Sequence, residues 1–485
     1  MFVSEEQVLE GLEPQVVWGY FSKILEIPHT SGNEEKIREF VESEAARLNL
    51  ELKKDDAGNI VIKKPAHKAR EGAEKIILQA HLDMVGQKKS GSEFDFLTDA
   101  IKPVIKDEWV KADGTTLGAD NGIGVAAALA VLASSDLAHP ELEVLFTASE
   151  EIGMLGARAL APHMISGKVL INLDSEELGE MSIGCAGGVD ISASLPFSYQ
   201  PNEKSGFTLL LSGLKGGHSG IDIDKKRGNA LKIIATLLAR IDDCINLHSI
   251  EGGDMRNAIC REAKAQFASD ALYSDLRTRI RAALAEIKTE LCEEDQKVKF
   301  TFVRNDDPMP EAMSEDTQGR IFQFLEAFPD GVIEMSQEFE DTVETSNNLA
   351  KIFIDGREMK FHSLARSLDD KKRATLELEI QELAAKFSGK VQFSDEYPAW
   401  QMSDGGEVVA ICYHQGANLG IEPKAKIIHA GLECGLIKQL HSGIDAISIG
   451  PTIEMPHSPS ERVNIASVDK FWRWLIAILQ AYAAM

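Results

Sequence analysis

Histidine and carboxylate side chains stand at the ends of several apolar runs in this sequence. The run "KIILQA" is followed by His81 and Asp83, and the run "LEVLFTA" is followed by Glu150 and Glu151. The run "VLINL" likewise ends at Asp174, the stretch "AISIGPTIEMPH" runs out of its strand to His457, and "TTLGADNG" places Asp120 at the start of a buried helix. Ligands of open α/β sheets gather at the carboxyl ends of the strands, so five separate segments are predicted to meet at one edge of a sheet.

The residue types at this predicted edge are those that bind transition metals. Histidine with carboxylate is the usual ligand set of zinc and neighbouring metals. Several buried carboxylates at one edge repel one another unless cations neutralise them. Two histidines with three carboxylates are enough for two metal ions, provided that one carboxylate bridges them.

Each residue taken alone has a simpler interpretation. His81 by itself is more typical of a hydrogen-bonded core histidine, and Asp120 of a helix cap. The pair Glu150–Glu151 fits a solvated turn, Asp174 fits an acidic surface segment, and His457 before "SP" fits any loop. It is their joint occurrence at strand ends that favours a metal site.

The elements that carry these residues alternate between strand and helix. Residues 34–48 and 121–134 have helical patterns, and strand patterns occupy 59–64, 75–80, 142–148 and 168–173. Such alternation predicts an α/β fold with a mostly parallel sheet and helices on both faces. After "GCAGGVD" the strand segments alternate apolar and polar residues, as half-exposed strands do. Near residue 400 the pattern of buried strands returns. We therefore predict a catalytic domain made of 1–186 and 400–485, interrupted by an α+β insert, 187–399.

Length and composition limit the class of protein. A chain of 485 residues is too long for one core, which agrees with more than one domain. The net charge of −26 disfavours nucleic acid and anionic membranes as partners. Residues 1–14 do not resemble a signal peptide, and the longest strongly apolar run, 124–133, is too short to cross a bilayer. None of the six cysteines forms a C-x-x-C pair, which fits free thiols and a cytoplasmic protein.

Several motifs resemble those of a known enzyme family. "HLDMV", "GADNG", "EEIGMLGA", "NLDSEE" and "MPHSP" are similar to the metal-site motifs of the two-zinc exopeptidases that include aminoacylase and bacterial dipeptidases. "GCAGG", "GLKGGHSG", "RNAI", "HAGLECG" and "SIGPT" also resemble that family. The resemblance covers nearly the whole chain, and the motifs are long enough to be specific.

The resemblance implies a role for each residue of the metal set. It assigns His81 and Asp174 to one metal, Glu151 and His457 to the other, and Asp120 to a bridge between them. Zn²⁺ is the expected ion, with Co²⁺ and Mn²⁺ as alternatives. Glu150 is then the general base, and Asp83 orients the His81 imidazole. Many relatives have Asp-Asp where this chain has Asp120–Asn121. The family has a cis peptide at this bond, and the sequence does not decide whether this chain has it too.

The resemblance also implies substrate contacts from the insert. His218 in "GGHSG" matches a histidine that reaches the substrate carbonyl from a partner subunit. Asn257 and Arg366 match residues that hold the substrate carboxylate, a group that suits a guanidinium fork. Without the resemblance, Arg366 fits a surface arginine and the glycines around His218 fit a turn. His429 and Glu433 in "HAGLECG" receive no role from the sequence.

The expected function is a two-metal dipeptidase. Its substrates would be unblocked dipeptides of broad sequence, with Xaa-His dipeptides among the candidates, and the insert would act as lid and dimerisation surface of a homodimer. Two alternatives remain open. One is an N-acyl amino acid deacylase on the same scaffold, and the other is a metal-stabilised binding protein without turnover, against which a free Glu150 beside the metals argues.

Overall fold

Two compact units make up the computed structural model, which describes residues 8–401, 406–441 and 443–485. The first unit contains 1–184, 400–427 and 432–485, and the second contains 185–399 and 428–431. The return of 428–431 to the second unit differs from the sequence prediction, which assigned all of 400–485 to the catalytic part. Residues 1–7, on which the expected lack of a leader partly rests, lie outside the described residues.

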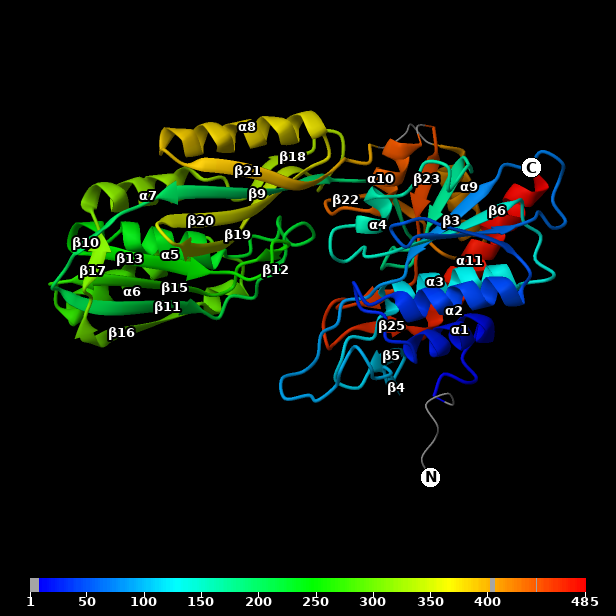
Figure 1. Ribbon diagram of the computed structural model, residues 1–485, viewed down its shortest axis with the longest axis horizontal. Coiled ribbons are helices and arrows are strands. Elements are labelled where there is room, and N and C mark those ends of the chain that lie inside the picture. Colours follow the sequence, from blue (N-terminus) through cyan, green and yellow to red (C-terminus); the bar gives the residue numbers. More distant parts are fainter. Residues whose placement is uncertain (1–7, 402–405, 442) are drawn as a thin grey trace, which may run out of the picture. The chain divides into compact units, whose positions relative to one another are not determined.

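The first unit is built on an eight-stranded mixed sheet, as far as the described residues show (Figure 1). Four neighbouring central strands, β6, β3, β7 and β23, run parallel, whereas β1, β2 and β8 join antiparallel. The predicted α/β class is therefore confirmed, with the parallel pairing confined to the centre. The strand order is β1 (Glu51–Lys54), β2 (Ile60–Lys64), β6 (Leu142–Thr147), β3 (Ile76–His81), β7 (Val169–Asn172), β23 (Asp445–Ser448), β8 (Glu180–Cys185) and β22 (Lys424–Ile428).

Helices cover both faces of this sheet. Ile76, Leu78 and Ala80 of β3 face a large apolar core, to which α1, α3 and α11 contribute. The alternate residue Gln79 faces the other side, where Glu433 of α10 accepts a hydrogen bond from it. The helices of the unit are α1 (Gln15–Leu25), α2 (Glu35–Arg47), α3 (Ala119–Ala133), α4 (Leu155–Arg158), α9 (Glu407–Asn418), α10 (Glu433–Leu440) and α11 (Ile465–Ala484).

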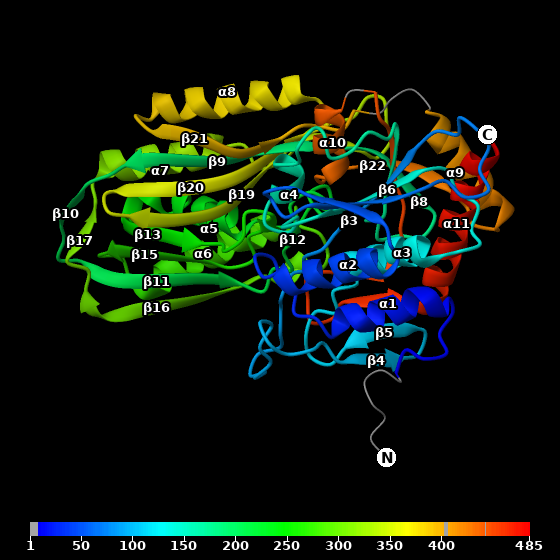
Figure 2. The same ribbon diagram turned by 45° about the vertical axis from the view of Figure 1, so that its right-hand side comes forward.

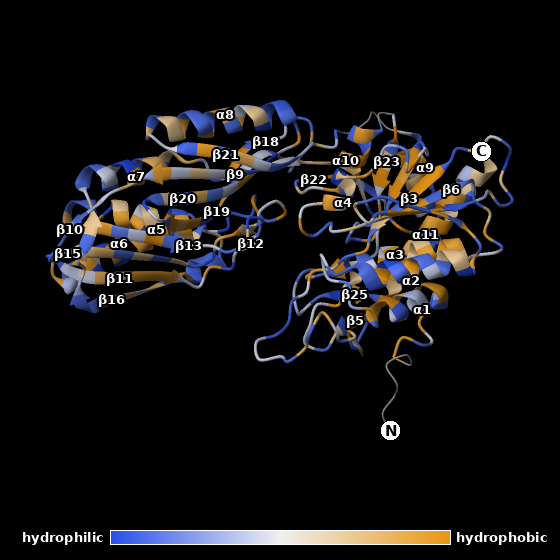
Figure 3. Cartoon of the chain, viewed as in Figure 1, coloured by the Kyte–Doolittle hydropathy of each residue, from blue (hydrophilic) through white to orange (hydrophobic). Residues whose placement is uncertain are grey.

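The central strands and α3 are coloured predominantly hydrophobic in Figure 3, as expected for elements buried on both sides. A small four-stranded sheet completes the unit. Its order is β24 (Ile453–Glu454), β25 (Arg462–Asn464), β5 (Trp109–Ala112) and β4 (Pro103–Lys106). No helix among the described residues combines the length and the apolar composition needed to cross a membrane.

The second unit is an antiparallel sheet with helices on one face. Val189, Ile191, Ala193 and Leu195 of β9 all enter its core, so one face of the strand packs against helices. Figure 2 shows the strand order, which is β21 (Lys390–Tyr397), β9 (Gly187–Pro196), β20 (Glu358–Ser367), β19 (Val343–Asp355), β13 (Asn246–Gly252), β15 (Ala263–Ser269), β11 (Ser205–Ser212) and β16 (Lys299–Pro308), with β18 (Gly331–Met335) paired to β19.

Four helices and two short ribbons complete this unit. The helices are α5 (Ala230–Ala239), α6 (Tyr273–Lys288), α7 (Glu315–Ala327) and α8 (Asp370–Lys386). The ribbons pair β10 (Tyr199–Pro201) with β17 (Glu311–Met313), and β12 (Gly217–His218) with β14 (Ala258–Ile259).

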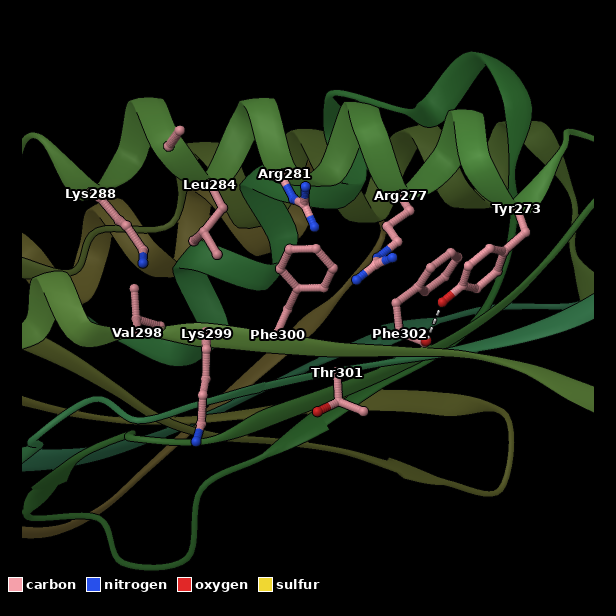
Figure 4. Close-up of a pocket in the computed structure, with 11 residues that line it drawn as sticks. Tyr273, Arg277, Arg281, Leu284, Lys288, Val298, Lys299, Phe300, Thr301 and Phe302 are labelled. Carbon is pink, nitrogen blue, oxygen red and sulfur yellow. Dashed lines mark hydrogen bonds between the residues drawn. The ribbon is translucent and has the colours of Figure 1, made fainter.

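A cavity of about 500 Å³ lies between α6 and the edge strand β16. Arg277, Arg281 and Lys288 point from the helix toward the strand, and Phe300 points back from the strand (Figure 4). The lining of this cavity contains none of the candidate site residues.

Candidate metal centre

The carboxyl ends of three adjacent parallel strands deliver most of the candidate ligands. β3 ends at His81, β6 ends three residues before Glu150, and β7 ends two residues before Asp174. These strands are neighbours in the order β6, β3, β7, so their ends lie side by side. Asp120 enters from the start of α3, and His457 follows β24.

Asp120 lies between the two imidazoles. Its Oδ1 is 3.1 Å from Nε2 of His81, and its Oδ2 is 3.1 Å from Nε2 of His457. His81 Nε2 is also 3.4 Å from Oδ1 of Asp174, and His457 Nε2 is 2.9 Å from Oε1 of Glu151. One carboxylate thus joins two clusters, each with one histidine and one further carboxylate.

The donor atoms fit a pair of metal ions. Those of His81, Asp120 and Asp174 lie within 4.8 Å of one another, and so do those of Asp120, Glu151 and His457. The two groups share only Asp120, which is the arrangement that a bridging carboxylate requires. A third group of the same kind joins Glu150 to His81 and Glu151, so the carboxylate of Glu150 lies beside both clusters.

The pKa values of His81, Glu150 and Glu151 are raised, as expected for a site with an excess of negative charge. Burial, followed by the charge of Glu151, raises the pKa of Glu150 well above its usual value. Burial and Asp120 raise the pKa of Glu151 to about 7. The buried His81 would by itself have a lowered pKa, but Asp174 and Asp120 raise that pKa well above the usual range. Protons here neutralise charge that a divalent cation would neutralise on binding, with release of those protons.

The carboxylate of Asp83 makes shorter contacts with the loop of Glu150 and Glu151 than with the imidazole of His81. His81 Nδ1 lies 2.9 Å from the backbone carbonyl of Asp83 and 3.5 Å from its carboxylate. The Asp83 carboxylate instead accepts the backbone N–H groups of Glu150 and Glu151, at 2.8 and 3.1 Å, and the Ser31 hydroxyl at 2.7 Å. The sequence predicted an orienting role for the carboxylate toward His81, and the structure shows that it also holds the loop of Glu150 and Glu151.

Asn121 holds Asp174, a contact that the sequence did not predict. Its Nδ2 donates to the carbonyl of Leu173 at 3.0 Å and to Oδ1 of Asp174. The peptide bond between Asp120 and Asn121 is cis. The asparagine at this position therefore contacts a neighbouring candidate ligand through its side-chain amide.

A ladder of hydrogen-bonded, buried polar side chains lies within the last residues of β3, β6 and β7. Gln79 donates through Nε2 to Thr147 at 3.1 Å and to Glu433 at 2.5 Å, and its Oε1 accepts from Asn172 at 2.5 Å. Thr147 donates to the same Glu433 carboxylate at 2.7 Å. The ladder ties the three ligand-bearing strands together, and only the polarity of Gln79, Thr147 and Asn172 within apolar runs signals it in the sequence.

The predicted substrate residues all lie in the second unit. His218 and Asn257 are brought together by the ribbon of β12 and β14, in which His218 pairs with Ala258. Nδ1 of His218 accepts the N–H groups of Gly220 and Ile221, both at 3.1 Å. The neutral imidazole therefore carries its proton on Nε2, which makes that atom a hydrogen-bond donor.

Arg366 is buried on β20, on the sheet face opposite the helices. Its Nη1 donates to the Tyr397 hydroxyl at 2.5 Å, and its Nε has no acceptor among the residues that the structure describes. The adjacent strand β9 places Gly188 opposite Arg366, where an added Cβ would lie 2.4 Å from the Tyr397 hydroxyl. His429, which the sequence left without a role, bonds through Nε2 to Ser346, the β19 partner of Arg366.

Comparisons with known proteins identify the family of this chain. Residues 77–481 match the family model described as peptidase family M20/M25/M40. The chain is 41% identical to the cytosol non-specific dipeptidase of Escherichia coli, over 98% of this chain and 99% of the relative.

Solved structures show the same similarity. The aminoacylhistidine dipeptidase of Vibrio alginolyticus shares 40% identity and a TM-score of 0.81, with 98% of each chain covered. The aminopeptidase PepT of Bacillus cereus, at 19% identity and a TM-score of 0.57, covers 97% of this chain and 99% of its own and shares the fold.

Proposed function

Because this chain belongs to the peptidase family M20/M25/M40, we propose that it is a metal-dependent dipeptidase. The single observation that carries the proposal is the Asp120 carboxylate, shared by two histidine–carboxylate clusters with Glu150 alongside. The substrates are unblocked dipeptides of broad sequence, including Xaa-His dipeptides, in keeping with the names of the relatives from E. coli and V. alginolyticus. The site of action is the cytoplasm.

We propose that the centre takes two divalent cations, with Zn²⁺ as the first choice. His81 and Asp174 would hold one ion, Glu151 and His457 would hold the other, and Asp120 would serve both. The ions would lower the pKa of a water molecule and polarise the scissile carbonyl. The donor set of nitrogen and oxygen ligands suits zinc and its neighbours, Co²⁺ and Mn²⁺ included.

Glu150 moves the proton of the reaction. Its backbone N–H is fixed by Asp83 at 2.8 Å, and its carboxylate lies beside both clusters. A carboxylate in this position can accept a proton from a water molecule at the centre. Glu150 takes a proton from the attacking water and returns it to the leaving amine of the product.

The second unit supplies recognition of the dipeptide. Arg366, with a buried Nε that lacks an acceptor among the described residues, binds the substrate carboxylate together with Asn257. His218 donates its Nε2 proton to the oxygen of the scissile carbonyl and so stabilises the developing negative charge. We propose that this histidine acts on the centre of the partner subunit in a homodimer.

Metal analysis paired with a substrate screen tests the central proposal. Purified protein is expected to hold two divalent ions per chain and to hydrolyse alanyl-histidine faster than its N-acetylated form. The reverse preference would indicate an N-acyl amino acid deacylase, and two metals without turnover would indicate a binding protein. Asp120→Ala should lose both metal and activity, and two metals retained in that variant would contradict the bridge.

Subunit exchange tests the proposed dimer. His218→Ala and Glu150→Gln are each expected to be nearly inactive. After exchange, one centre of the mixed dimer has an intact Glu150 and receives an intact His218, so part of the activity should return. Exchange demonstrated by mass, with no activity recovered, would contradict the sharing of His218 between subunits.

A further inference from the structure

Glu461 makes an unusual set of contacts close to the metal centre. Its side chain is buried, with 2% of the residue exposed. One carboxylate oxygen accepts the backbone N–H groups of Leu117 and Gly118, at 2.8 and 3.0 Å. The other accepts those of Ala119 and Asp120, at 2.7 and 3.3 Å. One side chain thus binds four consecutive amides that lie more than 340 positions away in the sequence.

The local backbone explains why these four amides converge. Gly118 has a left-handed φ of 71°, which turns successive N–H groups toward the same side. An added Cβ there would also lie 2.8 Å from Sδ of Met84. The amides of Ala119 and Asp120 open α3, where N–H groups have no partner inside the helix, and those of Leu117 and Gly118 directly precede it. The N-cap residue Gly118 offers no side chain to accept them, so the carboxylate of Glu461 does so, at the end of the helix that favours negative charge.

Glu461 connects the segments that carry two candidate ligands. At one end it holds the N–H of Asp120, whose two oxygens face His81 and His457. At the other end it lies four residues after His457, in a turn closed by the bond from its own N–H to the carbonyl of Ser458. β25 begins at the next residue and pairs with β5, which anchors this segment to the small sheet.

From this arrangement we infer that Glu461 is a positioning residue for the metal centre, which sets the separation of Asp120 and His457. The inference rests on the proposed two-metal site. A bridging carboxylate must hold its position within a few tenths of an ångström, and outer residues of this kind commonly change metal affinity 10- to 100-fold. A purely structural cap would instead change stability and leave metal affinity unaltered.

The decisive variant is Glu461→Gln, which preserves size and removes one of the two acceptor oxygens. The amide nitrogen then faces two N–H donors, so two of the four bonds are lost. We expect at least about a tenfold weaker affinity for the more weakly held Zn²⁺ ion, measured against a competing chelator. We also expect an altered visible absorption spectrum in the Co²⁺-loaded protein, since ligand geometry changes. Circular dichroism and the melting temperature of the metal-free protein show whether the fold is retained.

Glu454→Gln is the matched control. Glu454 lies in the same segment, three residues before His457, and forms a partly exposed ion pair with Arg462. The substitution is chemically identical, and it should leave Zn²⁺ affinity and the Co²⁺ spectrum unchanged. If Glu461→Gln fails to fold, Glu461→Asp retains the charge with a reach shorter by one methylene, and it should weaken Zn²⁺ binding without loss of the fold.

The outcomes separate this inference from the function on which it rests. If the parent protein does not bind two metal ions, the proposed centre itself fails. If the parent binds two and the folded Glu461 variant holds both as tightly, with an unchanged Co²⁺ spectrum, Glu461 is a stabilising cap only and the inference is overturned.

Discussion

Replacing Glu150 by glutamine separates proton transfer from metal binding. The variant keeps the size of the side chain and the backbone bond to Asp83, so the loop should retain its position. Glutamine cannot accept a proton at neutral pH. A positioned proton-transfer group contributes about 10²- to 10⁴-fold to the rate, which corresponds to roughly 3–5 kcal/mol of transition-state stabilisation. We expect a fall in kcat of that size, with little change in KM.

Metal content is the second measurement of this experiment. Glu150 has donor atoms near His81 and Glu151, so loss of metal would place it among the ligands rather than as the base. We expect Glu150→Gln to hold two ions per chain, and Glu151→Gln to hold fewer. Turnover of alanyl-histidine within tenfold of the parent, or a metal loss equal to that of Glu151→Gln, would refute the assignment of the general base.

Three further predictions follow from other contacts. Arg366→Met should weaken the binding of a dipeptide by about 10- to 100-fold, as expected for the loss of a charge-assisted hydrogen bond. The binding of the dipeptide amide should not change. Equal discrimination between acid and amide in parent and variant would exclude Arg366 as the anchor. Gly124→Ala places a Cβ 2.3 Å from Oδ1 of Asn121, so Asn121 must shift away from Asp174. We expect lower metal content and a loss of about 1–3 kcal/mol in thermal unfolding, whereas Gly19→Ala, with nothing within 4 Å of its Cβ, should stabilise α1 by up to about 1 kcal/mol. Burial lowers the pKa of Lys64 from 10.5 to about 8. Between pH 8 and 10.5 the unfolded chain therefore binds more protons at this lysine than the folded chain does. The stability of the parent protein consequently rises with pH over this range. The melting temperature of Lys64→Met relative to the parent should therefore fall between pH 8 and 10, and a constant difference would contradict the lowered pKa.

The sequence by itself determined which residues stand at the strand ends. An apolar run that stops at His81 or Asp174 is a local pattern, because alternation and burial of a strand depend on its own residues. The buried helix that follows Asp120 is a local pattern for the same reason, and it forms over Ala119–Ala133. The class of fold and the candidate ligand set therefore required no tertiary information.

The extent of the parallel sheet was less accessible from the sequence. Strands β1, β2 and β8 join antiparallel, although an apolar strand has the same local pattern in either direction. Partner choice depends on which edges remain free once the central strands have paired. Likewise, residues 428–431 belong to the second unit, where His429 bonds to Ser346, and nothing in "HAGLECG" specifies that partner.

Only the tertiary structure decided which polar groups support the ligands. Asn121 reads as a departure from a family motif, yet it donates to Asp174. Glu461 reads as one acidic residue in "SPSERV", yet its carboxylate binds four amides at the start of α3. The ligands of a metal are restricted to a few residue types, so sequence can reveal them. A hydrogen-bond acceptor for a backbone amide can come from many residue types and from any distance along the chain, and only folding brings that acceptor to its donors.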